Sequence, residues 1–429
     1  MHSAHSEFAA LPPMDVLFLH GNYPGQFPQL AAGMARMSRN RVVFLTNRAD
    51  PEAYPLDGVE VRRFDRHRGT TPGIHPYLHS SEQGVLNGQA VMRALADLLK
   101  EGFRPRLVIG HGGNGLLLFL RQLLPEACLV GYFEWWLRDE QTEWLFGEDS
   151  LDKRMLMMVR NGITLQELQL CDLAVTPTAW QQRQFPASER SKLQVVFDGV
   201  DTRLFRPEPW SGTIELRGDA CEQPLRLEPH QRVLSYATRG MEPLRGFPEF
   251  MRMLPALMRQ FPDLQVVIAG NDRIAYSYGA PTHGGSWKQH LLSELDGQLD
   301  RSRLYFTGLL PYGDYIRMIQ RSDLHAVFSR PYVTSWGLFQ AAACGARLLL
   351  NRDPSIQHVV GEHQAFWGDL DDPDQLQVVA ADALAVALEQ RVEPRCSMLD
   401  PSLDLRVCLR RWQTLINQSF KGVQAASGS

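Results

Sequence analysis

Residues 324–345 read LHAVFSRPYVTSWGLFQAAACG, and this stretch contains one complete strand–loop–helix unit. Its apolar start, residues 324–328, is typical of a buried parallel strand. The polar loop that follows ends at Ser335, a residue type that suits a helix N-cap. The small residues beyond it predict a short helix that stops at Gly345. A strand that passes through a loop directly into a helix is the building block of an α/β sheet.

The same unit recurs throughout the chain. Apolar runs that predict strands occur at residues 16–19, 41–45, 107–109, 128–132, 173–176, 233–237, 265–270, 304–307 and 324–328, and helical patterns lie between most of them. The series is interrupted once, at 208–230, where Pro, Gly and charged residues replace the periodicity. We therefore expect two doubly wound parallel-sheet domains of the Rossmann type that face a cleft.

This interruption defines the expected domain boundaries. Residues 1–13 are expected to form a disordered lead-in, 14–207 the first domain, 208–230 a linker, 231–395 the second domain, and 396–429 a C-terminal helix and tail. In open α/β sheets, ligands bind outside the carboxyl ends of the strands. The loops directly after each strand are therefore where we look for a site.

Composition excludes several classes of function. The chain has 429 residues with 44 Lys and Arg against 48 Asp and Glu, so its net charge of −4 disfavours nucleic-acid binding. We find no apolar run long enough for a membrane span, no signal-peptide pattern and no C-x-x-C pair. We expect a cytoplasmic location with reduced thiols.

The loops of the second domain carry the polar side chains that we consider first. Arg239 and Arg245 lie six residues apart between a strand end and a helix start, where guanidinium groups and a helix N-terminus suit a diphosphate. Gln340, in the first turns of the next helix, can bond a pair of ligand hydroxyls. Taken alone, these residues are also consistent with solvated arginines and a merely polar glutamine.

Six stretches in the same order resemble the motifs of the family 4 retaining glycosyltransferases, which have the GT-B fold. They are DGVDTRLFRP at 198–207, Arg239 with Arg245-Gly246, FTGLLP at 306–311, SDL at 322–324 leading to Ser329, QAAACG at 340–345, and DDPDQL at 371–376. Each motif alone is weak, but their common order is specific. The resemblance covers roughly residues 14–420.

The resemblance implies transfer of a sugar from a nucleotide-sugar donor to an acceptor hydroxyl with retained anomeric configuration. The acceptor would be a glycan, a lipid-linked glycan or a small molecule. The first domain would be the acceptor side, the second would bind the nucleotide-sugar, and the C-terminal helix would cross back to the first. The nucleotide-sugar is a substrate, so no cofactor is implied. The basic stretch 62–68 leaves contact with an anionic acceptor or a membrane surface open.

The resemblance also implies the roles of site residues. Those expected on the donor diphosphate are Arg239, Arg245, Gly246 and Gly25, and those expected around the nucleotide and sugar are Gln340, Ser335, Trp336, Gly337, Leu310 and Asn271. His111 follows a first-domain strand where the family has a catalytic histidine, and Glu134 is the nearby candidate acid/base or acceptor-binding group. Because arginines and a helix dipole would stabilise the leaving group, no metal is expected.

The chain departs from the family at its E-x7-E pair. Gln340 replaces the second Glu, and Tyr332, eight residues earlier, replaces the first. These changes keep two alternatives open: a catalytically inactive GT-B partner subunit, and a GT-B sugar-nucleotide epimerase or phosphorylase. A dinucleotide oxidoreductase is disfavoured because no strand is followed by a compact G-x-G-x-x-G.

Overall fold

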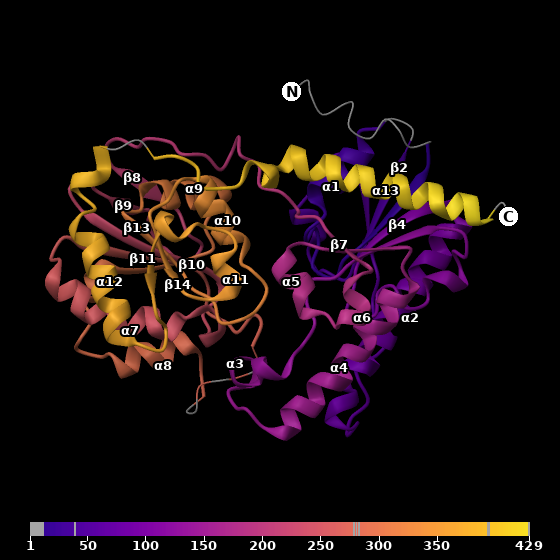
Figure 1. Cartoon of the computed structure of the whole chain (residues 1–429), viewed down its shortest axis with the longest axis horizontal. Helices are drawn as coiled ribbons and strands as arrows, with labels where there is room; N and C mark the ends of the chain where they lie inside the picture. Colours follow the sequence, from indigo (N-terminus) through magenta and orange to yellow (C-terminus); the bar gives the residue numbers. More distant parts are fainter. Residues whose placement is uncertain are drawn as a thin grey trace. The chain divides into compact units, whose positions relative to one another are not determined.

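The computed structural model of the chain describes residues 13–37, 40–277, 279, 281, 284–392 and 395–427. The predicted lead-in, 1–13, lies outside this range except for Pro13. The chain divides into two compact units. Unit 1 comprises Met1–Asp139, Ser150–Gly199 and Leu405–Ser429, and unit 2 comprises Glu140–Asp149 and Val200–Asp404. Both are α/β units built on a parallel sheet, as predicted (Figure 1).

Unit 1 contains a seven-stranded parallel sheet in the order β3-β2-β1-β4-β5-β6-β7. Its strands are β1 (Asp15–Leu19), β2 (Arg41–Thr46), β3 (Val59–Arg63), β4 (Pro105–His111), β5 (Cys128–Tyr132), β6 (Leu173–Thr176) and β7 (Leu193–Val195). Its helices are α1 (Pro28–Ala35), α2 (His79–Lys100), α4 (Leu151–Leu170), α5 (Ala179–Gln184), α6 (Ala187–Arg190) and α13 (Leu405–Ser427).

Both faces of the unit 1 sheet are buried at its central strands β1, β2, β4, β5 and β6, which explains why these strands are nearly continuous apolar runs. Phe18 of β1 points into a cluster with α1 and α13, whereas Leu17 points into a second cluster with α2. The C-terminal helix α13 contributes Trp412, Ile416 and Phe420, spaced four residues apart, to the first cluster. This spacing places the three side chains on one helix face.

Unit 2 contains a six-stranded parallel sheet in the order β12-β11-β10-β13-β14-β15. Its strands are β10 (Arg232–Gly240), β11 (Leu264–Asn271), β12 (Leu304–Gly308), β13 (Leu324–Val327), β14 (Leu348–Asn351) and β15 (Ala365–Gly368). Its helices are α3 (Thr142–Phe146), α7 (Phe247–Gln260), α8 (Trp287–Glu294), α9 (Tyr312–Arg321), α10 (Trp336–Ala343), α11 (Pro354–Gln357) and α12 (Pro373–Ala385).

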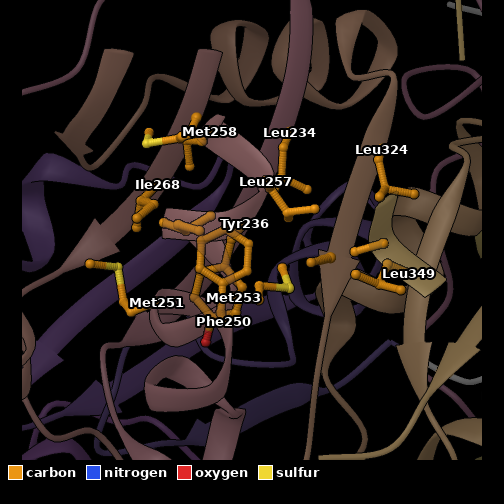
Figure 2. Packing of buried hydrophobic residues seen from close by; sticks show 14 of the residues in the cluster. Leu234, Tyr236, Phe250, Met251, Met253, Leu257, Met258, Ile268, Leu324 and Leu349 are labelled. Atoms are coloured by element: carbon orange, nitrogen blue, oxygen red, sulfur yellow. The ribbon is translucent and has the colours of Figure 1, made fainter. Parts of the chain in front are cut away.

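Helix α7 covers β10 with its apolar face, and Figure 2 shows this packing. The ring of Phe250 stacks on that of Tyr236 with centroids 4.7 Å apart. The predicted helix after Ser335 is also present, as α10, and Gly345 follows it with a φ of +64°. Ser335 occupies the N-cap position, but its side chain makes no capping hydrogen bond.

The structure divides the chain at other positions than the predicted boundaries. Within the expected linker 208–230, β8 (Ile214–Leu216) and β9 (Leu225–Leu227) pair as a small antiparallel sheet that belongs to unit 2. The hairpin docks on the main sheet, because the backbone N–H of Leu309 donates to Asp219 Oδ1 at 2.7 Å. Strands of three residues are too short to show periodicity in sequence.

In both sheets the strand order reverses once, between β1 and β4 in unit 1 and between β10 and β13 in unit 2. The loops on either side of such a reversal diverge and leave room for a ligand at the carboxyl ends of the strands. These two edges are therefore where we look for a ligand site in each unit.

A buried charge cluster anchors the amino end of β13. Asp323 and Arg321 are fully buried, and their side chains are 3.1 Å apart. Arg391 makes two further bonds to the Asp323 carboxylate, at 2.5 and 2.6 Å, and the backbone N–H of Val233 in β10 makes another at 2.8 Å. One carboxylate thus joins β10, β13 and the segment around Arg391.

Asp323→Asn should therefore destabilise unit 2 strongly, because it leaves two guanidinium charges without a countercharge. We expect a loss of about 3–5 kcal/mol in the free energy of unfolding, measured by urea denaturation. The matched control is Asp263→Asn, which breaks a pair with Arg232 that is partly exposed and should cost less than about 1 kcal/mol. Equal losses in the two variants would contradict the anchoring role.

Candidate functional site

Arg245 lies at the strand reversal of unit 2. It ends the short 3-10 turn Pro243–Arg245 after β10, and its side chain is buried. Its Nη1 donates to the hydroxyl of Ser329, just beyond β13, at 2.8 Å. A guanidinium has five N–H donors, and within the described part of the chain the others have no hydrogen-bond partner. Arg245 therefore offers unused donors at the ligand edge of the sheet.

Two aromatic rings flank this guanidinium. Its Cζ is 4.9 Å from the ring centroid of Tyr276 and 5.9 Å from that of Tyr332. Arg239, which is exposed, also approaches Tyr276, at 5.9 Å. The faces of these rings attract the cations and limit their movement. Tyr332, which stands where the family has a carboxylate, thus contacts the predicted diphosphate-binding arginine.

Glu242 holds the loop after β11 in place, and sequence reasoning missed it. This fully buried carboxylate accepts hydrogen bonds from the backbone N–H groups of Ala275, Tyr276 and Ser277 and from the Ser277 hydroxyl, at 2.6–3.3 Å. These bonds hold the Tyr276 ring next to Arg239 and Arg245. The sequence held one signal for this role: Glu242 is the acidic residue between Arg239 and Arg245, and the sequence suggested no other function for it.

Gly246 lets α7 begin close to the end of β13. Its φ is +65°, and a Cβ at this position would lie 2.6 Å from the Cβ of Phe328. The hydroxyl of Tyr236 in β10 donates to the Arg245 carbonyl at 2.8 Å, and this bond holds the turn Pro243–Arg245 against the sheet. The N-terminus of α7, the positive end of the helix dipole, thus follows directly after Arg245.

The predicted nucleotide-binding residues lie on other elements of the same edge. Ser335, Trp336 and Gly337 form the start of α10, and the Trp336 side chain is exposed. Gln340, one turn further, donates from Nε2 to the Tyr312 hydroxyl at 3.3 Å, which leaves its Oε1 available as an acceptor.

The other two predicted residues follow neighbouring strands. Asn271 is the last residue of β11, and Leu310 lies between β12 and α9. The carbonyl of Asn271 accepts hydrogen bonds from the backbone N–H groups of Met241 and Arg273, at 3.3 and 2.9 Å. Asn271 thus ties the loop after β10 to the end of β11. Roles for Asn271 and Leu310 at a nucleotide stay predictions.

In unit 1, the two predicted catalytic residues meet. His111 is the last residue of β4 and Glu134 follows β5, and His111 Nε2 is 3.1 Å from Glu134 Oε2. The two side chains are 12% and 26% exposed, so a ligand can reach both. Burial raises the pKa of Glu134, but the hydrogen bond and charge of His111 outweigh this effect, and the net pKa is lowered. Glu134 is therefore ionised at neutral pH.

Gly25 has a packing role that the sequence did not reveal. Its φ is +56°, and a Cβ there would lie 2.5 Å from the His20 ring. Any side chain at position 25 would displace this imidazole, which lies beside that of His111 with ring centroids 4.6 Å apart. The predicted contact of Gly25 with the donor diphosphate stays a prediction.

A second carboxylate that sequence reasoning missed, Glu167, supports the loop after His111. It lies on α4, is fully buried, and accepts hydrogen bonds from the backbone N–H groups of Gly113 and Leu117 at 2.5 and 2.7 Å. Burial raises its pKa to about 7, although these hydrogen bonds oppose the shift. A lone acid on the apolar face of a helix was the only sequence signal.

Two kinds of site are not seen in the part of the chain that the structure describes. Across residues 13–427, apart from the gaps given above, no three His, Cys, Asp or Glu side chains are grouped so that they could hold a metal ion. Within the same residues, no helix combines the length and the apolar character that crossing a bilayer requires.

Comparison with known proteins gives a family match over part of the chain and structural matches over nearly all of it. Residues 38–205 match the model of the glycosyl transferase family 4 group. This part of the chain is therefore similar to the family 4 glycosyltransferases. No curated protein matches the chain by sequence.

Solved structures share the fold of this chain. Sucrose-phosphate synthase from Thermosynechococcus elongatus has a TM-score of 0.62 at 14% identity, over 95% of this chain and 100% of that one. HepE from Anabaena, in complex with UDP and glucose, has a TM-score of 0.54 at 14% identity, over 96% and 100%. A putative UDP-N-acetylglucosamine 2-epimerase from Listeria monocytogenes has a TM-score of 0.55 at 14% identity, over 96% and 98%. The predicted GT-B fold is confirmed.

Arg245→Ala should weaken the binding of the preferred nucleoside diphosphate by about 1.5–3 kcal/mol, because a charged hydrogen bond is lost. This corresponds to roughly 10- to 150-fold in Kd by calorimetric titration. The affinity of Arg245→Lys should lie between those of the wild type and Arg245→Ala, since lysine keeps the positive charge but lacks the forked donors of the guanidinium. Arg259→Ala, on the exposed side of α7, is the control. If Arg245→Ala and Arg245→Lys bind the nucleoside diphosphate as tightly as Arg259→Ala and the wild type do, the diphosphate does not bind at Arg245.

Gln340 gives a second test, because a carboxylate bonds hydroxyls more strongly than an amide does. Gln340→Glu should keep or tighten nucleotide affinity by at most about 1–2 kcal/mol, since it can accept from both Tyr312 and a ribose hydroxyl. Gln340→Ala should weaken affinity and leave the melting temperature nearly unchanged. Tight wild-type binding that is indifferent to Gln340→Ala would remove this residue from the nucleotide site.

Proposed function

We propose that this protein is a retaining glycosyltransferase that moves a sugar from a nucleotide-sugar to an acceptor hydroxyl. The observation that carries the proposal is Arg245, which presents unused donors at the strand reversal of unit 2, next to the N-terminus of α7. An anion with several oxygens is the ligand that this arrangement suits best. HepE, which shares the fold, binds UDP and glucose, so UDP-glucose is the first donor to test.

In the proposed reaction, the bond between the anomeric carbon and the diphosphate oxygen breaks, and its electron pair stays on the diphosphate. The acceptor oxygen forms the new bond on the same face of the sugar, and the acceptor proton passes to a base. Arg239, Arg245 and the dipole of α7 would stabilise the charge that develops on the leaving diphosphate. Groups that are held in position before the reaction need little reorganisation during it.

Unit 1 would supply the acceptor side of the reaction. Glu134 is ionised, lies at the carboxyl edge of the sheet and is bonded to His111. A carboxylate in this state can bind a hydroxyl and take its proton. The acceptor class is proposed only as a hydroxyl compound: a glycan, a lipid-linked glycan or a small molecule.

The experiment that tests the function has two stages. A thermal-shift panel of UDP-, GDP-, ADP- and TDP-sugars identifies the donor, because a bound ligand raises apparent stability by mass action. Labelled donor is then incubated with pooled acceptors, and the anomeric configuration of the product is read by NMR. An inverted product would exclude a retaining mechanism.

The missing carboxylates favour one competing function, an inactive partner subunit. Tyr332 occupies the place of the family's sugar-binding Glu and lies 5.7 Å from the Tyr276 ring. If no nucleoside diphosphate binds the wild type, the inactive partner subunit replaces the active glycosyltransferase as the proposed function. Release of free UDP and an epimerised sugar without any acceptor would instead favour a sugar-nucleotide epimerase.

The rate of sugar transfer should be unchanged in EDTA, because cationic side chains would stabilise the leaving diphosphate, as a divalent ion does in other enzymes. The measurement compares initial rates before and after chelation, with added Mn²⁺ or Mg²⁺ as the reversal. Loss of activity that either metal restores would show that the leaving group is stabilised by a metal after all.

A further inference from the structure

Three neighbouring strands of unit 2 each place a polar side chain at their carboxyl ends. β10, β13 and β14 are adjacent in the sheet. Arg245 follows β10, Ser329 follows β13, and Asn351 is the last residue of β14. All three side chains are buried. Asn351 lies outside the six sequence motifs, so its place beside the other two is a result of the strand order.

The Asn351 amide holds the backbone of Ser329 on both sides. The backbone N–H of Ser329 donates to Asn351 Oδ1 at 3.0 Å, and Asn351 Nδ2 donates to the Ser329 carbonyl at 2.8 Å. This is the one amide orientation that gives each bond a donor and an acceptor, because a flipped amide would set donor against donor. The backbone of Ser329 is therefore fixed to the end of β14.

The hydroxyl of Ser329 has one proton, which is used within its own loop. Ser329 Oγ donates to the Arg330 carbonyl at 2.8 Å, so only a lone pair is left to face Arg245. Arg245 Nη1 donates to that oxygen at 2.8 Å. The serine thus accepts from the guanidinium, and the direction of every bond from Asn351 to Arg245 is determined.

Further bonds anchor the loop that carries this serine. The backbone N–H of Arg330 donates to the Leu244 carbonyl at 2.9 Å, which joins the loop to the turn Pro243–Arg245. The buried side chain of Arg330 pairs with Glu249 of α7 at 2.9 Å and with Asp371 at 2.7 Å. The Ser329 hydroxyl is therefore attached to a rigid part of unit 2.

Neutral groups, and not carboxylates, hold Arg245 in place. Among the residues that the structure describes, none forms an ion pair with Arg245, and its side-chain hydrogen bond goes to a hydroxyl. The acids on neighbouring loops have other partners: Glu242 accepts from the loop after β11, and Asp353 accepts from the N–H and hydroxyl of Ser355 at 2.8 and 2.5 Å. A carboxylate in place of Ser329 would also hold the guanidinium, but it would compete with an anionic ligand.

We propose that Ser329 and Asn351 are positioning residues, which hold the Arg245 guanidinium through neutral hydrogen bonds and so leave its charge for the donor diphosphate. This proposal rests on the proposed transferase function. Asn351 fixes the backbone of Ser329, and Ser329 fixes Arg245. A side chain that is already ordered loses less conformational freedom when a ligand binds, so the anion is bound more tightly.

The test is calorimetric titration with UDP and with inorganic pyrophosphate, which carries the diphosphate without base or ribose. Ser329→Ala removes the acceptor at Arg245 and should raise both Kd values roughly 3- to 10-fold, as expected for one hydrogen bond. Because Ser329 acts through Arg245, the same change in the Arg245→Ala background should have no further effect. Asn351→Leu should weaken binding as Ser329→Ala does, and combining the two should not add their effects.

Asn161 of α4 offers a matched control in unit 1. It holds the backbone of Leu137 by the same pair of bonds, since the Leu137 N–H donates to its Oδ1 at 3.0 Å and its Nδ2 donates to the Leu137 carbonyl at 2.8 Å. Asn161→Leu should lower the melting temperature about as much as Asn351→Leu does, and leave both Kd values unchanged. Equal weakening of binding by the two Asn→Leu variants would overturn the proposal, because lost stability would then be the cause.

A second readout does not need a bound nucleotide. In protein with ¹⁵N-labelled arginine, the Nη signals of Arg245, assigned with Arg245→Lys, report how fast the guanidinium rotates. Rotation should be slow in the wild type and faster in Ser329→Ala and Asn351→Leu.

Either of two results would overturn the proposal: equal rotation in the wild type and both variants, or a Ser329→Ala effect on Kd that is zero or that persists without Arg245. If neither UDP nor pyrophosphate binds the wild type, the proposed function fails. The rotation of the Arg245 guanidinium then decides alone whether Ser329 and Asn351 hold it.

Discussion

Burial of both faces of each sheet is the constraint on which the rest of this structure depends. A parallel sheet is covered by helices on both sides, so its strands are apolar along nearly their whole length. Polar chemistry can then occur only where a strand ends and its loop reaches solvent. The candidate residues of both units, Arg245 and Asn271 in one and His111 and Glu134 in the other, lie at such ends for this reason.

The same constraint explains the buried acids that support the site. A loop that must stay ordered over a sheet edge has backbone N–H groups that water does not reach, and each of them needs a partner. Glu242 and Glu167 serve this purpose, one in each unit, by accepting several N–H groups at once. The positions of Tyr276 and of the loop after His111 are consequences of these two carboxylates.

Tyr332 and Gln340 stand where the family 4 glycosyltransferases have two carboxylates, so this part of unit 2 carries less negative charge. A Glu at position 332 would lie beside Arg245 and would neutralise part of its charge before any donor arrived. Tyr332 instead presents a ring to the guanidinium, which keeps the full charge for an anionic ligand. In the proposed function, this unneutralised charge would be available to the leaving diphosphate.

The sequence by itself determined the fold class, the two-unit organisation and most of the ligand-edge residues, because strand runs and the loops after them are local features. His111 with Glu134, and Arg245 with Gly246, were selected because the sequence around them resembles the family 4 glycosyltransferases. The tertiary structure alone decided that His111 touches Glu134, that Gly25 serves His20, and that 214–227 forms a hairpin of unit 2. It also revealed Glu242 and Glu167. The hydrogen-bond partners of these two carboxylates are up to 54 residues away in sequence, and hydrogen-bond geometry across such separations depends on how strands and helices pack, which no local pattern encodes.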